Sequence, residues 1–227
     1  MESLNLLGHD TCTACHLRMT ATQVVPGYGN LKAKLVFVGE APGEIEDREG
    51  KPFIGPAGQL QRSVLTGMGI DPDRCFFTNV YHCRPPHNDI AQAVGSVCPK
   101  IWLPGELSRL NETKVVVALG RTAMKFFRPE MRDWELVRDH ALRDTRWPDP
   151  ETGPLWIVGS YHPSAALKKG VSKGTRAGNV ILVSLGASLQ RAMYYLRDEE
   201  SMVASLQRAM YYLRDDEFFT EVSDDGK

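Results

Sequence analysis

The chain has no long apolar run. None of its apolar stretches approaches the roughly 18 residues that a membrane-spanning helix needs. Residues Met1 to Asn5 have neither the basic start nor the apolar core of a secretory signal. A phosphate-binding loop, Gly-x-x-x-x-Gly-Lys-[Ser/Thr], is also missing. These absences argue against a membrane protein, a secreted protein and a P-loop nucleotide-binding protein, and we expect a cytoplasmic protein with no membrane contact.

The chain also lacks an excess of either charge. It carries 27 Lys and Arg against 28 Asp and Glu, a formal net charge of -1, so affinity for nucleic acid would have to come from a local basic patch. Its 227 residues, 42% of them apolar, are enough to bury a full core without a partner. We expect a monomer with one domain, residues 1–200, and a tail, residues 201–227.

Cysteine is scarce, but four of the five cysteines have the spacing of a metal site. Cys12 and Cys15 form a C-x-x-C pair, and Cys83 and Cys98 follow far downstream. In the cytoplasm such cysteines stay reduced, which favours thiolate ligands over disulfides. Zinc and iron-sulfur clusters both use four thiolates, and the spacing does not separate them. The fifth, Cys75, heads an apolar run and is expected to pack as a small hydrophobe.

Four short apolar runs rich in β-branched residues are separated by segments of helix length. This alternation favours βαβ units, and we expect a three-layer α/β/α fold around a central, mainly parallel four-stranded sheet. The charged, proline-bearing stretch 128–154 is expected to form a helix followed by an exposed excursion. The four runs are Leu35–Val38, Phe76–Val80, Val115–Leu119 and Trp156–Val158.

The chemically distinctive residues directly follow these runs. Glu40 comes after the first run, Asn79 lies near the end of the second, and His162 comes shortly after the fourth. In mainly parallel sheets, ligands bind at the carboxyl ends of the strands. We therefore expect these three side chains to converge on one cleft that offers a carboxylate, an amide and an imidazole.

The C-terminal region contains an exact internal repeat. The twelve residues ASLQRAMYYLRD occur at 187–198 and again at 204–215, an offset of 17. On one continuous helix the two copies would differ by roughly 100° in direction, so both could not face the same core. We expect the first copy to dock through Leu189, Met193 and Leu196, and the second to be an appended helix, either a duplication without function or a partner-binding segment.

Three blocks of the sequence together carry a family resemblance. The first, from Gly39 to Gly58, reads GEAPGE followed by GKPFIGPAG; the second is Thr78-Asn79-Val80 with CRPP at 83–86; the third is His162-Pro163-Ser164. With the cysteines, they resemble the family-4, iron-sulfur uracil-DNA glycosylases, and the resemblance extends from about residue 10 to residue 195.

The resemblance implies a monofunctional DNA N-glycosylase of base excision repair. Such an enzyme extrudes deoxyuridine from single- or double-stranded DNA and hydrolyses its N-glycosidic bond, which leaves an abasic site. It would act at the nucleoid within the cytoplasm. The family's four cysteines hold a [4Fe-4S] cluster, and this implication extends to Cys12, Cys15, Cys83 and Cys98, so the expected metal changes from zinc to iron.

The resemblance also implies roles for single residues. Phe53 would stack on the flipped base, and the amide of Asn79 would pair with O4 and N3–H of uracil but not with cytosine. His162 would donate to O2 as the glycosidic bond breaks. Taken singly, the same residues also fit structural roles, as a core phenylalanine, a turn asparagine and a His-Pro turn.

A second set would complete the site. Glu40, with Ala41 and Gly43, would line the floor of the pocket, where Glu40 either positions the attacking water or excludes the C5 methyl group of thymine. The best basic patch follows the third block, and Lys168 and Lys169 there would bind phosphates beside the flipped nucleotide. As an isolated charge run, this patch equally fits a solvated loop.

The chain departs from the family after CRPP. The family usually continues with a glycine, an asparagine and a basic residue, whereas here the residues are His87, Asn88 and Asp89, which weakens any phosphate contact at this point. A sister branch crosslinks to uracil DNA through a histidine in a long basic loop, and no such insertion lies between Asn79 and Cys98. The alternatives are His87 as an unusual nucleophile and, more broadly, a non-catalytic or covalently trapping DNA-binding protein of the same superfamily.

Overall fold

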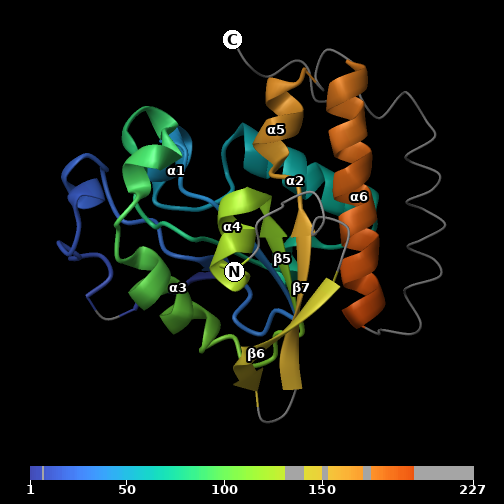
Figure 1. Cartoon of the computed structure of the whole chain (residues 1–227), viewed down its shortest axis with the longest axis horizontal. Helices are drawn as coiled ribbons and strands as arrows, with labels where there is room; N and C mark the ends of the chain where they lie inside the picture. The colour runs from blue at the N-terminus through green and yellow to red at the C-terminus, as the bar shows by residue number, and fades with distance from the viewer. Residues whose placement is uncertain (7, 131–140, 150–152, 171–174, 197–227) are drawn as a thin grey trace.

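The computed structural model describes residues 1–6, 8–130, 141–149, 153–170 and 175–196 (Figure 1). The strands are β1 (Glu2–Ser3), β2 (Tyr28–Gly29), β3 (Leu35–Gly39), β4 (Phe76–Asn79), β5 (Val115–Leu119), β6 (Ala141–Asp149) and β7 (Gly153–Ser160). The α-helices are α1 (Glu44–Glu49), α2 (Pro56–Gly67), α3 (Cys98–Leu107), α4 (Gly120–Phe127), α5 (Pro163–Lys168) and α6 (Arg176–Leu196). Short 3-10 turns are η1 (His16–Met19), η2 (Pro72–Arg74), η3 (Pro86–Asn88) and η4 (Ile90–Ala93).

The predicted parallel core is present, but the sheet is wider than four strands. In the part of the chain that is described, the strand order is β1-β2-β4-β3-β5-β7-β6. The four central strands, β4, β3, β5 and β7, correspond to the four predicted runs and are parallel to one another. Antiparallel strands extend both edges, β2 and β1 beside β4 and β6 beside β7. The predicted count of four is therefore wrong, because the described residues form a sheet of seven strands.

Both faces of the central strands are covered, as the predicted three-layer fold requires. Alternate residues of each strand point to opposite faces. Leu35 and Phe37 of β3 belong to a core shared with α2, α5 and α6, and Val36 and Val38 belong to a core shared with α3 and α4. All four are almost fully buried. Figure 1 accordingly shows α3 and α6 on opposite sides of the strands.

The first copy of the repeat docks through the predicted face. It forms the C-terminal half of α6, where Leu189 and Leu196 are buried and Met193 packs against the same core. Tyr195 of this copy stacks on Trp156 of β7, with ring centroids 4.1 Å apart. The second copy and the predicted tail at 201–227 lie outside the described residues, so the domain boundary stays a prediction.

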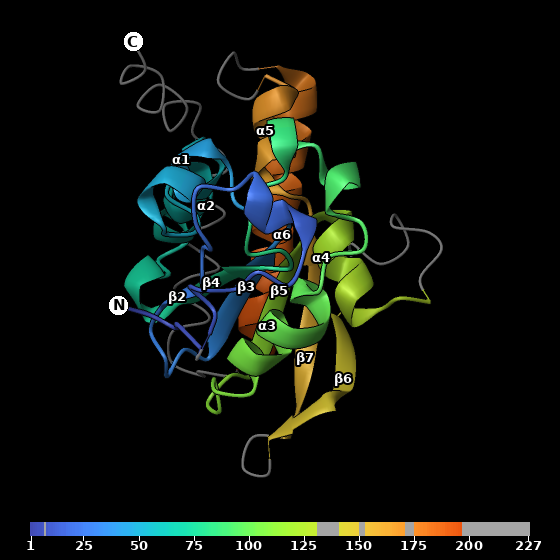
Figure 2. The same cartoon turned by 90° about the vertical axis from the view of Figure 1, so that its left-hand side faces the viewer.

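The N-terminal segment lies against the loops that follow β4. Leu17, Ala21 and Val24 form a small core with Cys83 and Ala93. Figure 2 shows this segment, in blue, beside the green loops between β4 and α3. None of the described helices is long and apolar enough to cross a bilayer.

Candidate active site and metal centre

The carboxyl ends of the parallel strands surround a small cavity of about 60 Å³. Phe53, Asn79 and His162 all line it, although more than a hundred positions separate the first from the last. Ala41 and Glu46 complete the wall, together with the start of α2. The structure therefore brings together the aromatic ring, the amide and the imidazole that the sequence analysis singled out.

Gly39, the last residue of β3, makes room for two of these side chains. It pairs with Asn79 across the parallel strands β3 and β4. A Cβ atom at Gly39 would lie 2.4 Å from Asn79 Oδ1 and 2.7 Å from Phe53 Cζ. These distances are far below van der Waals contact, so only glycine lets the amide and the ring share this space.

We expect Gly39→Ala to lower the rate of base excision by about 10- to 100-fold, because displacing a substrate-positioning group by about 1 Å is enough for losses of this size. Single-turnover assays measure the rate. Gly105→Ala is the matched control, because a Cβ there meets only the end of the Leu6 side chain at 2.8 Å. A Gly39→Ala protein with wild-type activity would contradict the packing argument.

Phe53 is held in an unusual backbone conformation. Its φ is 57°, in the left-handed region that a bulky residue rarely adopts without strong local constraints. Gly58 provides one constraint, since a Cβ there would lie 2.2 Å from the Phe53 carbonyl carbon. The Phe77 ring packs on Phe53 with centroids 5.4 Å apart. The Phe53 ring is therefore fixed in place, and its side chain is only 5% exposed.

His162 presents a neutral donor to the cavity. It caps α5, and its Nδ1 accepts a hydrogen bond from the backbone N–H of Ser164 at 3.2 Å, with Ser164 Oγ 2.8 Å away. A ring nitrogen that accepts a hydrogen bond from N–H carries no proton, so the neutral ring holds its proton on Nε2. Burial, with a smaller contribution from the positive charge of Lys168, lowers the pKa of His162 to about 4. At neutral pH the ring is thus an uncharged donor.

This lowered pKa predicts a loss of stability in mild acid. In the unfolded chain the ring takes up a proton below about pH 6.5, whereas in the folded chain it does so only near pH 4. The unfolded state therefore binds more protons between these values, and stability falls as pH falls through this window. We expect His162→Gln to lose less stability than wild type between pH 7 and pH 5, by about 1 to 2 kcal/mol. Urea unfolding at both pH values measures the difference, and equal losses would contradict the assignment.

The carboxylate on the cavity wall is Glu46, which the sequence analysis missed. Glu46 lies in α1, is 9% exposed, and accepts a hydrogen bond from the Gly55 backbone N–H at 2.8 Å. It thereby ties α1 to the loop that carries Phe53. Glu40 does not line the cavity, and its Oε2 accepts a hydrogen bond from Thr122 Oγ1.

The remaining predicted residues lie around the site rather than in it. Ala41 lines the cavity, whereas Gly43 does not and instead caps the start of α1. Lys168 and Lys169 are exposed at the end of α5, the short helix that begins after His162. His87 is exposed on η3 with a φ of 54° and is not part of the cavity wall.

The four predicted ligand cysteines gather at a second place. Cys12 and Cys15 pack beside Cys83 and Leu17 in the small core under the N-terminal segment. Burial, together with the neighbouring thiols of Cys98, Cys15 and Cys12, raises the pKa of Cys83 to about 12. All four are free cysteines. The structure thus brings together two pairs that lie far apart in the sequence.

Cys75 stands apart from this set, as expected. It is 2% exposed and packs in the core that α2 and α6 share, and its Sγ donates to the backbone oxygen of Asp71. Burial raises the pKa of this thiol to about 12, which makes it unreactive. The prediction that Cys75 packs as a small hydrophobe is confirmed.

Comparison with known proteins agrees with this geometry. Residues 26–193 match the family model described as "Uracil DNA glycosylase superfamily". The type-4 uracil-DNA glycosylase of Pyrobaculum aerophilum is 46% identical over 167 residues, which cover 72% of this chain and 83% of the relative. The type-4 enzyme of Archaeoglobus fulgidus is 37% identical, and the match covers 74% of this chain and 84% of the relative. The type-4 enzyme of Thermotoga maritima is 38% identical, and the match covers 69% of this chain and 78% of the relative.

The matched region spans every described strand except β1 and all the residues that line the cavity. The family model covers more than half of the chain, and several type-4 relatives match over most of their length. These comparisons agree with the fold and the site described above. The chain belongs to the uracil-DNA glycosylase superfamily, in its type-4 branch.

Proposed function

We propose that this protein is a uracil-DNA glycosylase that hydrolyses the N-glycosidic bond of deoxyuridine flipped out of DNA, and that the cavity lined by Phe53, Asn79 and His162 is its base pocket. The observation that carries the proposal is the meeting of these three side chains in one cavity. They supply a stacking surface, a pairing edge and a neutral donor. Type-4 membership supports the same reaction.

Phe53 and Asn79 would select the base. The Phe53 ring, fixed by its backbone and by Phe77, offers a stacking face worth about 1 to 3 kcal/mol. The Asn79 amide, 3% exposed, can donate to O4 and accept from N3–H of uracil. Cytosine presents the opposite pattern, so its entry would leave buried polar groups unpaired and cost about 1 to 3 kcal/mol for each.

His162 would stabilise the leaving base. As the bond to the sugar breaks, negative charge develops on the uracil ring, and a donor at O2 lowers its energy. The hydrogen bond from Ser164 to Nδ1 fixes the tautomer with its proton on Nε2, so the correct atom carries the proton before the substrate arrives. No charge has to be created or buried for this donor to act.

Two carboxylates would organise the floor of the pocket. Glu46 holds the loop of Phe53 in place through Gly55. Glu40 precedes Ala41, and Thr122 fixes its carboxylate. We assign to Glu40 the ordering of the attacking water at the edge of the pocket. Glu40 does not need to act as a strong base, because an oxocarbenium-like sugar reacts with water with little assistance.

We assign a [4Fe-4S] cluster to Cys12, Cys15, Cys83 and Cys98. The four thiols lie near one another under the N-terminal segment, and four thiolates are the ligand set that an iron-sulfur cluster uses. When bound, the cluster would tie the N-terminal segment to the loops between β4 and α3.

DNA would approach over α5. Lys168 and Lys169 are exposed at the far end of α5, the helix that His162 caps, and their charges would bind phosphates next to the flipped nucleotide. A short local patch of this kind agrees with the near-neutral net charge of the chain. Binding should therefore weaken with salt, with a slope set by only a few phosphate contacts.

Incubation with uracil-containing single- and double-stranded oligonucleotides tests the function. Treatment with alkali then cleaves abasic sites, and we expect strand scission only at uracil. A matched oligonucleotide with cytosine in place of uracil is the control. Tight binding without release of uracil would instead support a non-catalytic DNA-binding protein, and a stable covalent adduct would support trapping through a residue such as His87.

A further inference from the structure

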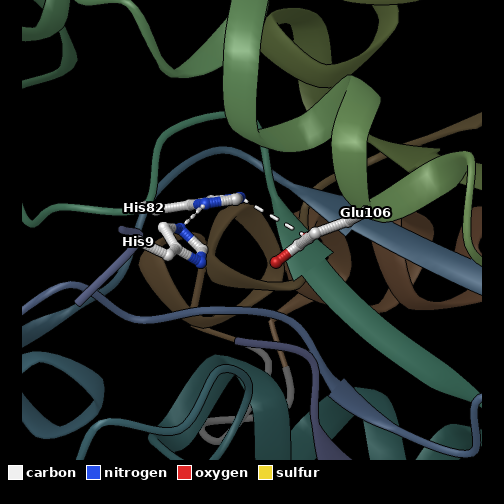
Figure 3. Close-up of side chains that lie close together, drawn as sticks. All are labelled: His9, His82 and Glu106. Carbon is white, nitrogen blue, oxygen red and sulfur yellow. Dashed lines mark hydrogen bonds and ion pairs between the residues drawn. The ribbon is translucent and has the colours of Figure 1, made fainter. Parts of the chain in front are cut away.

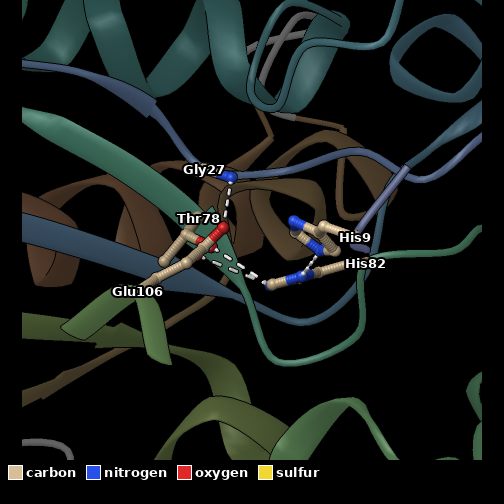
Figure 4. Close-up of polar contacts among 5 residues, drawn as sticks. All are labelled: His9, Gly27, Thr78, His82 and Glu106. Atoms are coloured by element: carbon tan, nitrogen blue, oxygen red, sulfur yellow. Dashed lines mark hydrogen bonds and ion pairs between the residues drawn. The ribbon is translucent and has the colours of Figure 1, made fainter. Parts of the chain in front are cut away.

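A buried chain of polar side chains joins the N-terminal segment to the sheet, outside the cavity. His9 Nε2 lies 2.6 Å from His82 Nδ1, and His82 Nε2 lies 3.4 Å from Thr78 Oγ1. Thr78 Oγ1 in turn lies 2.5 Å from Glu106 Oε2. Figure 4 shows the chain running from Glu106 to His9. All four side chains are inaccessible to solvent, and none has a part in the proposed base excision.

The donors and acceptors that link these four side chains can be matched without a buried charge, and only His9 Nδ1, at the far end, is buried without a hydrogen-bond partner. Glu106 Oε1 accepts from the Gly27 backbone N–H at 2.7 Å, so a proton on Oε2 can be donated to Thr78. The Thr78 hydroxyl then donates to His82 Nε2, and His82 Nδ1–H donates to His9 Nε2. Burial raises the pKa of Glu106 to about 8, in the direction of this protonated form.

The same side chains also have to be weighed as a metal site. His9, His82 and Glu106 offer ligand atoms that lie within 4.8 Å of one another. His82, however, directs Nδ1 to His9 and Nε2 towards Glu106 (Figure 3). Because the two nitrogens of one ring point away from each other, the three residues do not converge on a single ion, and a hydrogen-bonded chain fits better.

The two histidines of this chain, His9 and His82, each adjoin a cysteine of the four-cysteine site. The Cys12 backbone N–H donates to the backbone oxygen of His9 at 3.3 Å. His82 directly precedes Cys83. Burial raises the pKa of the Cys98 thiol, and a hydrogen bond from the His82 backbone opposes that rise. The chain therefore fixes the spacing between the two cysteine pairs.

We propose that His9, His82, Thr78 and Glu106 form an uncharged, hydrogen-bonded latch that holds the segment of Cys12 and Cys15 against the segment of Cys83 and Cys98. The latch places the four thiols before any cofactor enters. His9 and His82 are thus positioning residues for the cofactor site. The role of the latch in placing the thiols rests on the proposed four-cysteine cofactor site, whereas the hydrogen bonds of the latch do not depend on that proposal.

Hydrogen exchange of the purified full-length protein tests the latch, with the peptide covering residues 8–15 as the reporter. His9→Phe keeps a ring to stack on Trp102, 4.5 Å away in the wild type, but leaves His82 Nδ1–H unpaired. We expect this peptide to exchange about 10-fold faster or more, as the loss of a buried hydrogen bond predicts, and iron to be lost faster to a chelator. His16→Ala is the control, because His16 lies in the same region but its bond to the Gln92 oxygen is exposed.

A second pair of variants tests the uncharged state and does not depend on His9. Glu106→Gln can still donate to Thr78 and accept from Gly27, so exchange should stay within about 3-fold of wild type. Glu106→Met leaves both partners unpaired and should match His9→Phe. An equal rise in the exchange rate in both Glu106 variants would overturn the uncharged latch, and so would a wild-type exchange rate in His9→Phe. Zinc that the wild type retains and these variants lose would show that the three residues bind a metal instead. Uracil excision measured in parallel separates the two proposals, because a wild type that releases no uracil refutes the function and leaves the exchange result standing.

Discussion

Replacing His162 with alanine is expected to lower kcat for uracil excision by about 100- to 1000-fold, or about 3 to 4 kcal/mol, the usual cost of one donor to a developing anion. KM should change little, because the donor acts mainly when charge appears on the base. Single-turnover kinetics on a uracil oligonucleotide measures the loss. Retention of more than a tenth of wild-type kcat would remove His162 from the mechanism while leaving the function intact.

Ser164, which contacts Nδ1 of His162, provides the control variant for this experiment. Ser164→Ala removes the hydroxyl near Nδ1 but keeps the backbone N–H that fixes the ring, so the loss should be below about 10-fold. Because the folded ring has a pKa of about 4, wild-type kcat should stay level as pH falls from 8 to 5. A decline with an apparent pKa near 6.5 would show that the ring titrates normally and is not held neutral.

Replacing Cys83 with alanine is expected to have the largest effect on stability. Cys83 is buried where the two cysteine pairs meet. Among the described residues, the other buried members of the small core around it are Leu17, Ala21, Val24 and Ala93. So little apolar contact cannot hold the N-terminal segment alone. We expect loss of iron and visible absorption, and a fall in Tm of about 10 °C or more, which for a chain of this size corresponds to several kcal/mol.

Cys75→Ala is the matched control for this variant. Cys75 is equally buried, at 2% exposure against 3% for Cys83, but lies in the core shared with α2 and α6. It should keep its iron and lose only about 1 kcal/mol, the usual cost of a small core truncation. Equal iron loss in both variants would mean that the metal does not depend on Cys83, and the four-cysteine assignment would fail.

The parallel core was predictable because each of its strands is buried on both faces. Continuous apolar runs such as Val115–Leu119, which lie between segments of helix length, are typical of strands in the centre of a parallel sheet. The edge strands were not predictable for the opposite reason. β1 and β2 have only two residues each, and β6 contains charges and Pro148, so its sequence is typical of a loop. Its antiparallel pairing with β7, its neighbour in the chain, is not indicated by any regular alternation of apolar and polar residues along β6.

The site was predictable where residues sit in a recognisable motif and not elsewhere. Asn79 and His162 follow strands within the blocks of the family resemblance, so both the fold rule and the resemblance indicated them. Glu46 lies in the charged sequence EIEDRE, which favours a solvated helix surface, and only the structure shows its contact with Gly55. The His9 and His82 pair joins positions 73 apart, a separation at which sequence carries no local signal.

The strands that carry the site all end at the same edge of the sheet, and β7 begins far from it. Eight residues of extended chain in β7 place Gly153 about 25 Å from Ser160. Asp149 of β6 pairs with Gly153 of β7 and so lies at that distant end of the sheet. A fluorescent reporter or an affinity tag inserted there would leave the base pocket and the DNA path unobstructed, which would allow single-molecule observation of the protein as it searches along a duplex.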